Sequence, residues 1–168
     1  MGIVSLTLLL TFGAELLLGA LGKDATLTGR TEVWTAIERQ LVGREWTGFG
    51  YGAIWDHTSR WAPLAWIEHD AGFRPVHAHN GWLEVWLGFG LIGVIVWGAY
   101  LLETWIRTLI ATYRPSSGTG AYLALPTLCM FTLMTFSESI VINYNDLRWV
   151  MFTAIAVKLA APKAWLKR

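Results

Sequence analysis

Long apolar runs, separated by polar segments, dominate the pattern of the chain. A helix that crosses a bilayer needs about 20 mostly apolar residues. Four segments approach this length: 3–21, 81–102, 121–142 and 147–165. The first lacks the basic start and the small-residue cleavage site of a signal peptide, so we interpret it as a spanning helix. We therefore predict an all-α integral membrane protein with about four transmembrane helices in one membrane domain.

The basic residues of the short connections predict the orientation, because lysine and arginine mark cytoplasmic loops. Arg107 and Arg114 lie in the predicted connection 103–120, and further basic residues follow Lys158. We expect that side to be cytoplasmic. The long segment 22–80 then faces outward, since long loops translocate largely regardless of their charge.

A helical periodicity runs through the first part of this outward loop. Val33, Ile37 and Leu41 recur at a spacing of four in "TLTGRTEVWTAIERQLVG", which predicts an amphipathic helix. Thr28 is suited to the N-cap and Gly43 to the C-terminal stop. The apolar stripe would lie on the membrane surface or against the other helices.

Composition supports the membrane prediction. Only 15% of the residues are charged, whereas soluble domains carry roughly a quarter. The 11 tryptophans suit a chain that is anchored at two bilayer interfaces. The net charge of +1 gives no reason to expect nucleic acid, and the single cysteine provides neither a disulfide framework nor a thiolate metal site.

Arg30 is a candidate anion-binding residue because it opens the predicted amphipathic helix. A cation in the first turn opposes the helix dipole. The same position becomes useful if an anion binds, since free backbone N–H groups at a helix start already attract phosphate and Arg30 adds a planar charged fork. The alternative is a solvated arginine that pairs with Glu32 or Asp24.

The stretch "GREWTGFGYGAIW" alternates Gly48, Gly50 and Gly52 with aromatic residues. Glycine lets a backbone approach a ligand closely, and aromatic rings offer faces to sugars. These glycines and Arg44 are therefore candidate substrate-binding residues. The alternatives are a flexible turn or a glycine-bearing strand, with Arg44 and Glu45 as a solvated pair.

Two histidines lie at the start of the second predicted spanning helix, in "HAHN". If this segment is extended, His77 and His79 face the same way. An imidazole titrates near neutrality and suits acid–base chemistry at the lipid boundary. The alternative is that His79 and Asn80 cap the helix. A zinc site completed by other polar residues (Asp56, His57, His69 and Asp70) matches no recognised spacing, so we predict no metal.

Carboxylates inside predicted spanning helices are expensive and are functional candidates by default. Glu84 and Glu138 fall near the outward ends of their helices and are candidate substrate-binding residues; we expect arginine partners among Arg30, Arg44 and Arg148. Glu15 lies nearer the middle of its helix, where a structural polar contact between helices is the simpler role.

The run "GFGLIG", residues 88–93, matches the glycine fingerprint of dinucleotide-binding proteins. It has no preceding strand and lies in an apolar helix, so packing of small residues explains it better.

Three motifs in order, "GKDATLTGRTEVW", "REWTGFGYGAIW" and "HAHNGWLEVWLGFGLIGV", resemble the O-antigen ligase and polysaccharide polymerase superfamily, and are most similar to its exopolysaccharide polymerase branch. "ESIVINYNDLRWVMF" follows as the last helices of the family would. The resemblance covers essentially the whole chain.

The resemblance implies a bacterial inner-membrane glycosyltransferase of the GT-C type that uses no metal and no cofactor. Such an enzyme moves a glycan from undecaprenyl diphosphate to an acceptor hydroxyl at the periplasmic face, with inversion. By motif, Arg30 matches the diphosphate-binding arginine and His79 the essential histidine, which acts as a base or as a cation. His77 and Asn80 are neighbouring candidates.

Members of this family commonly have some ten to twelve spanning helices, so we expect this chain to be a C-terminal portion. Its partners would be the lipid-linked glycan, membrane lipid, and an N-terminal half or other polysaccharide-assembly membrane proteins. The alternative function is a non-catalytic membrane partner or a small transporter subunit.

Overall fold

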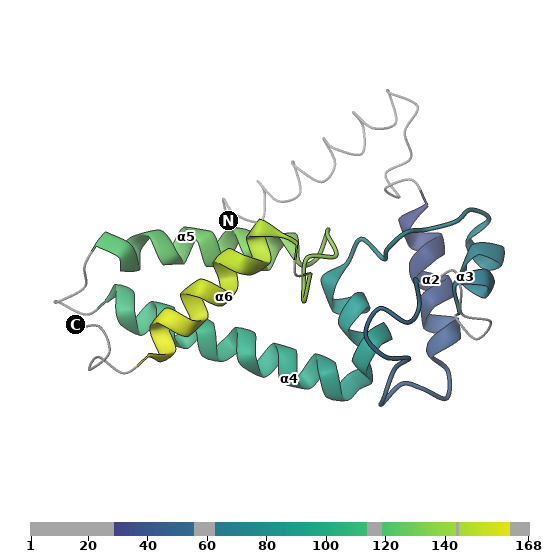
Figure 1. Ribbon diagram of the computed structural model, residues 1–168, viewed down its shortest axis with the longest axis horizontal. Coiled ribbons are helices and arrows are strands. Elements are labelled where there is room, and N and C mark those ends of the chain that lie inside the picture. Colours follow the sequence, from purple (N-terminus) through teal and green to yellow (C-terminus); the bar gives the residue numbers. More distant parts are fainter. Residues whose placement is uncertain (1–28, 56–62, 114–118, 144, 162–168) are drawn as a thin grey trace, which may run out of the picture.

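A computed structural model of the protein describes residues 29–55, 63–113, 119–143 and 145–161 (Figure 1). The described residues form helices and loops and contain no strand. The helices are α2 (Arg30–Leu41), α3 (Leu64–Ala71), α4 (Gly81–Thr112), α5 (Thr119–Met134) and α6 (Leu147–Ala160). The predicted spanning segment 3–21 lies outside the described residues. The all-α prediction agrees with the part of the chain that the structure describes.

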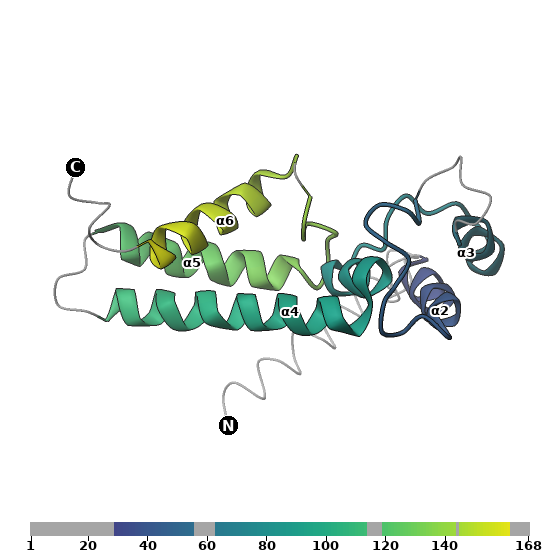
Figure 2. The same cartoon turned by 60° about the horizontal axis from the view of Figure 1, so that its bottom comes forward.

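The helices form two groups. The first, α4, α5 and α6, packs lengthwise as a bundle, and α2 and α3 pack together beyond one end of it (Figures 1 and 2). The start of α4, the end of α5 and the start of α6 lie toward α2 and α3. Successive helices of the bundle therefore alternate in direction (Figures 1 and 2).

The bundle suits an apolar surrounding. By length and composition, α4 is able to cross a membrane, and the Tyr122–Met134 part of α5 is a shorter apolar helix. Large apolar side chains of α4, α5 and α6 are exposed, including Ile95, Leu133 and Val157. In water such a surface would be costly, whereas a lipid surrounding would accommodate it. The described structure is thus consistent with a membrane protein.

An aromatic cluster holds the three bundle helices together. Phe131 of α5 stacks on Phe152 of α6, with ring centroids 4.5 Å apart and an interplanar angle of 12°. Trp97 of α4 meets Phe152 edge-on at 5.3 Å. Such aromatic pairs contribute about 0.5–1.5 kcal/mol beyond the area they bury. The cluster therefore fixes α4, α5 and α6 to one another.

The predicted amphipathic helix is present as α2, and its stripe is buried. Val33, Ile37 and Leu41 are inaccessible and pack with Ile67 of α3 and Leu87 of α4 in one core. The stripe therefore faces other helices rather than the membrane surface.

The ends of α2 agree in part with the prediction. Gly43 follows the C-cap with a φ of 82°, a left-handed conformation that stops a helix, as predicted. The N-cap is Gly29, with a φ of 84°, rather than Thr28, which lies outside the described residues. A side chain at Gly29 would approach the ring of Phe73 to 2.7 Å, so the chain enters α2 through a position that only glycine fills easily.

Two helices of the bundle end at other residues than the predicted spanning segments. Helix α4 continues to Thr112, so residues 103–112 of the predicted cytoplasmic loop are helical, and Arg107 pairs with Glu103 one turn earlier at 2.6 Å. This i,i+4 pair supports the helix beyond the apolar run. Helix α5 ends at Met134 rather than 142, because tight turns follow it, and Glu138 consequently lies in the α5–α6 connection.

A further difference is α3, an eight-residue helix inside the predicted loop 22–80. It packs against α2 and contributes Ile67 to the shared core. It has no capping side chain, so no capping residue marks its start in the sequence.

The predicted helix 81–102 is also interrupted. Gly90 adopts φ 67° and ψ −168°, and the loop 45–50 lies across this break. Phe49 N donates to Leu87 O at 2.9 Å, and Leu91 N donates to Glu45 O at 2.7 Å. These loop bonds replace the helical bonds that the break removes. Two glycines of "GFGLIG", Gly88 and Gly90, therefore pack against a loop backbone, not against a second helix.

Candidate functional site

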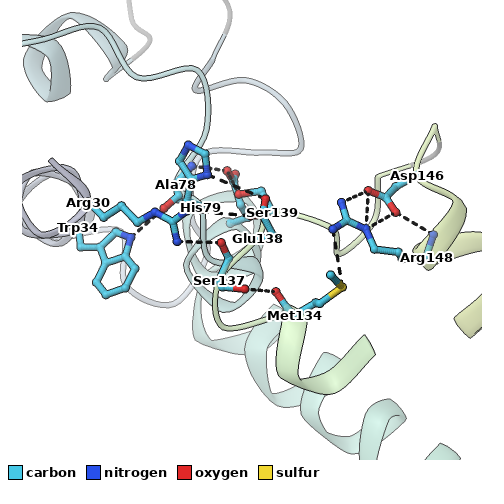
Figure 3. A network of polar contacts seen from close by, with 11 residues as sticks. Arg30, Trp34, Ala78, His79, Met134, Ser137, Glu138, Ser139, Asp146 and Arg148 are labelled. Carbon is cyan, nitrogen blue, oxygen red and sulfur yellow. Dashed lines mark hydrogen bonds and ion pairs between the residues drawn. The ribbon is translucent and has the colours of Figure 1, made fainter. Parts of the chain in front are cut away.

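Arg30 and His79 meet at one carboxylate (Figure 3). Arg30, the first residue of α2, has its Nη2 4.0 Å from Glu138 Oε1. The Nδ1 of His79, just before α4, lies 4.0 Å from Glu138 Oε2. Each oxygen of the Glu138 carboxylate thus faces a different basic side chain. The three residues come from α2, from the segment before α4 and from the α5–α6 connection.

A backbone contact holds the guanidinium in place. Arg30 Nη1 donates to Ser137 O at 3.1 Å. Glu32, one of the two alternative partners of Arg30, instead accepts a hydrogen bond from Thr31, and the other, Asp24, lies outside the described residues. The predicted pairing of Glu138 with Arg30 is present, whereas Arg30 does not pair with Glu32.

The two histidines are neighbours, although the segment is not extended. His79 has a left-handed φ of 51°, and its ring lies against that of His77, with centroids 3.9 Å apart and an interplanar angle of 70°. The Nδ1 atoms of both rings are buried without a hydrogen-bond partner among the described residues. A buried, unpaired ring nitrogen is uncommon and is a candidate for a functional role.

The surroundings of His79 favour its neutral form. Partial burial lowers the pKa of its imidazole below the ordinary value, and the positive charges of His77 and Arg30 lower it further. Glu138 and Glu84 oppose these effects. At neutral pH the ring is therefore able to accept a proton.

Glu84 fixes the backbone next to His79. Its Oε1 accepts from Ala78 N at 2.7 Å and from Ser139 Oγ at 3.0 Å, and its Oε2 accepts from Trp55 Nε1 at 2.9 Å. Trp34 of α2 donates to the carbonyl of Ala78 at 2.8 Å. None of these partners is an arginine, so Glu84 joins three segments around His79 through neutral donors.

Asn80 caps α4, as predicted for one reading of this motif. Its Oδ1 accepts from Trp82 N at 2.9 Å and from Leu83 N at 3.3 Å. Gly81 N donates to Thr135 O at 2.7 Å, which joins the start of α4 to the end of α5. His79 is thus placed between a capped helix start and the connection that carries Glu138.

Arg148, the third arginine predicted as a partner of Glu84 or Glu138, pairs with a different carboxylate. Arg148 of α6 contacts Asp146 at 2.6 Å, and its Nη1 lies 3.8 Å from the sulfur of Met134. Hydrogen bonds from Arg148 hold the pKa of the Asp146 carboxyl below its usual value. This tight pair closes the end of the connection that carries Glu138 (Figure 3).

The remaining predicted binding residues lie in the loop 43–55. Arg44 is exposed, with its guanidinium 5.0 Å from the centroid of the Phe49 ring. A side chain at Gly48 would come within 2.7 Å of the backbone of α4, whereas one at Gly52 would meet nothing within 4 Å. The structure thus explains Gly48 by close packing and does not place Arg44 beside Arg30. Its neighbour Glu45 bonds Gly43 N rather than forming a pair with Arg44.

Several residues of the site were not predicted from the sequence. Trp34, Trp55, Ser137 and Ser139 all bond within it. Among these four residues, the sequence marks only the two serines, because they flank the candidate residue Glu138 in "SES". In the described ranges no three histidine, cysteine or carboxylate side chains gather closely enough to hold a metal ion.

Comparison with known proteins identifies a relative. Over 144 residues the chain is 33% identical to the exopolysaccharide production protein ExoQ of Rhizobium meliloti (strain 1021). The alignment covers 80% of this chain and 33% of ExoQ, so the chain spans about a third of the length of this curated relative. No family model matches the chain, and no solved structure matches it. The chain is therefore similar to an exopolysaccharide production protein, which supports the resemblance of its motifs to an O-antigen ligase and polysaccharide polymerase-like family.

Proposed function

We propose that the chain contributes the donor site of a membrane glycosyltransferase in exopolysaccharide production. The donor is a glycan on undecaprenyl diphosphate, and the acceptor is a sugar hydroxyl at the periplasmic face of the bacterial inner membrane. The relationship to ExoQ supports the role in exopolysaccharide production. The transfer step, the multi-pass arrangement and the outward position of residues 22–80 belong to the proposal, as does the activity of the whole enzyme.

The observation that carries the proposal is the meeting of Arg30 and His79 at Glu138. A diphosphate leaving group needs a fixed positive charge in the absence of a metal, and preorganised donors of this kind stabilise charge as it develops. Arg30 supplies this charge at the start of α2, where free N–H groups add to it. His79 contacts the same carboxylate with a partly exposed imidazole, whose pKa lies below its ordinary value.

The transfer step is a single displacement. The acceptor oxygen forms a bond to the anomeric carbon, and the bond from that carbon to the diphosphate oxygen breaks. Its electron pair leaves with the diphosphate, which Arg30 binds. The proton of the acceptor hydroxyl passes to His79, and attack opposite the leaving group inverts the anomeric configuration.

A genetic test uses the strain that carries this gene. We expect deletion to lower exopolysaccharide output, wild-type chain to restore it, and Arg30→Ala or His79→Ala to fail to restore it. Arg74→Gln is a matched control, because Arg74 is an exposed arginine with a loose 4.0 Å contact to Glu68. Normal polysaccharide from both site variants, at equal membrane levels, would remove the proposed function.

A further inference from the structure

We propose that Glu138 is an exchangeable partner in this site: its carboxylate holds Arg30 before the diphosphate binds and afterwards orients and stabilises His79. The inference rests on the proposed function. Glu138 is then a positioning residue, since it acts through Arg30 and His79 and need not touch the sugar.

The contacts of Glu138 are loose enough to exchange. Both lie at 4.0 Å, beyond hydrogen-bond distance, and its side chain is 37% exposed. Exposed ion pairs stabilise a protein only weakly, so a diphosphate with more negative charge competes easily for Arg30. By contrast, Asp146 and Arg148 lie 2.6 Å apart with Asp146 largely buried, and we expect that pair to persist.

Local structure allows the carboxylate to move while its neighbours stay. Glu138 lies in the connection after α5, and its backbone N donates to Met134 O at 2.9 Å. Arg30 remains oriented by Ser137 O when the carboxylate leaves. The side chain of Glu138 therefore changes partner without any change in the path of the backbone.

The unpaired Nδ1 of His79 gives the carboxylate its second role. This atom is buried, has no hydrogen-bond partner among the described residues, and faces Glu138 Oε2. A proton on Nδ1 that points to Glu138 leaves the lone pair of Nε2 for the acceptor hydroxyl. Catalytic hydrogen bonds are often long before substrate binds and shorten in the complex. After proton transfer the carboxylate faces an imidazolium, whose charge it stabilises, as the aspartate of a Ser-His-Asp triad does for its histidine.

Glu138→Gln distinguishes this role from a purely structural one, because we expect the change to strengthen diphosphate binding but to slow transfer. Without the competing carboxylate, Arg30 binds undecaprenyl diphosphate more tightly, by up to about fivefold for a contact of this kind. Without the negative charge, the pKa of His79 falls and transfer slows. The acidic groups facing His79 are Glu138 and Glu84, and the basic ones are His77 and Arg30.

The experiment uses the full chain in lipid vesicles, with radiolabelled undecaprenyl diphosphate as the probe and isotope-labelled histidine for NMR titration of His79. Exopolysaccharide output in the complemented strain reports transfer. Glu68→Gln is the control, since Glu68 also makes a loose 4.0 Å contact to an arginine. We expect tighter binding, a lower His79 pKa and lower output for Glu138→Gln only, with partial recovery of output in Glu138→Asp.

Unchanged or weaker binding by Glu138→Gln, together with an unchanged His79 titration, would overturn the inference while leaving the proposed function in place. If the wild-type chain does not bind the diphosphate, or if its affinity does not depend on Arg30, the proposed function is wrong. This inference, which rests on it, is then wrong as well.

Discussion

The imidazoles of His77 and His79 lie edge to face, with ring centroids 3.9 Å apart. Both rings have a buried Nδ1 without a described hydrogen-bond partner. A positive charge on His77 lowers the pKa of His79, and the guanidinium of Arg30 lowers it further. The protonation state of His79 is therefore coupled to every charge that enters the site.

The first prediction concerns the pH dependence of transfer. If His79 is the base, activity falls as pH drops through its pKa, which lies below the ordinary value in the free protein. Bound diphosphate adds negative charge and raises this pKa. Since kcat/KM reports the free enzyme and kcat the complex, the acid limb of kcat should lie at higher pH than that of kcat/KM.

His77→Gln tests the cause of this shift. It removes the neighbouring imidazole whose charge lowers the pKa of His79, so the acid limb of kcat/KM should move to higher pH. A limb that stays in place would show that His77 does not act on His79. Loss of activity as pH rises through this range would instead identify His79 as a cation rather than a base.

The second prediction concerns Glu84, whose two oxygens accept from three donors. Glu84→Gln retains one acceptor oxygen and points its NH₂ group at a donor, Trp55 Nε1. We expect a loss of about 1–3 kcal/mol in the free energy of unfolding, measured by thermal unfolding in nanodiscs.

A double variant separates this effect from a general loss of packing. Trp55→Phe removes the donor that Glu84→Gln leaves facing the new NH₂ group. The two changes together should therefore cost less than the sum of the single changes. Strict additivity would mean that the Trp55–Glu84 hydrogen bond does not stabilise the protein.

The third prediction concerns the break in α4. Gly90 adopts a conformation that is essentially restricted to glycine, at a cost of about 1–3 kcal/mol for other residues. A Cβ there would also come within 2.1 Å of the Trp46 backbone. Gly90→Ala should release the loop 45–50, which limited proteolysis of the membrane-embedded protein would detect.

Gly98 provides the matched control for this change. It lies in the same helix, and a Cβ there would meet only the ring of Trp82, at 3.8 Å. Because alanine favours a helix over glycine by about 1 kcal/mol, Gly98→Ala should leave the protease pattern unchanged or more protected. Equal sensitivity of the two variants would contradict the role of Gly90.

Side-chain periodicity predicted those parts of the fold that depend on it. The buried stripe of Val33, Ile37 and Leu41 and the stop at Gly43 follow from helical spacing and glycine geometry. The break at Gly90 could not be predicted, since backbone groups of the loop make its hydrogen bonds and leave no pattern of side chains.

The candidate site was predicted by residue but not by arrangement. Arg30, His79 and Glu138 were each singled out, and Asn80 caps α4 as its position before an apolar run suggests. Glu138 was placed inside a spanning helix, because apolar residues continue beyond the end of α5. Its meeting with His79 depends on turns after Met134 and on a left-handed residue, neither of which a hydropathy pattern specifies.

The most direct test of the account is the affinity of the full chain in lipid vesicles for undecaprenyl diphosphate, compared between wild type, Arg30→Gln and the control Arg74→Gln. A charge-assisted contact to phosphate is worth about 1.5–3 kcal/mol, so Arg30→Gln should weaken binding by at least about tenfold while Arg74→Gln has no effect. Equal affinity of Arg30→Gln and wild type would contradict the central claim that Arg30 binds the diphosphate beside His79.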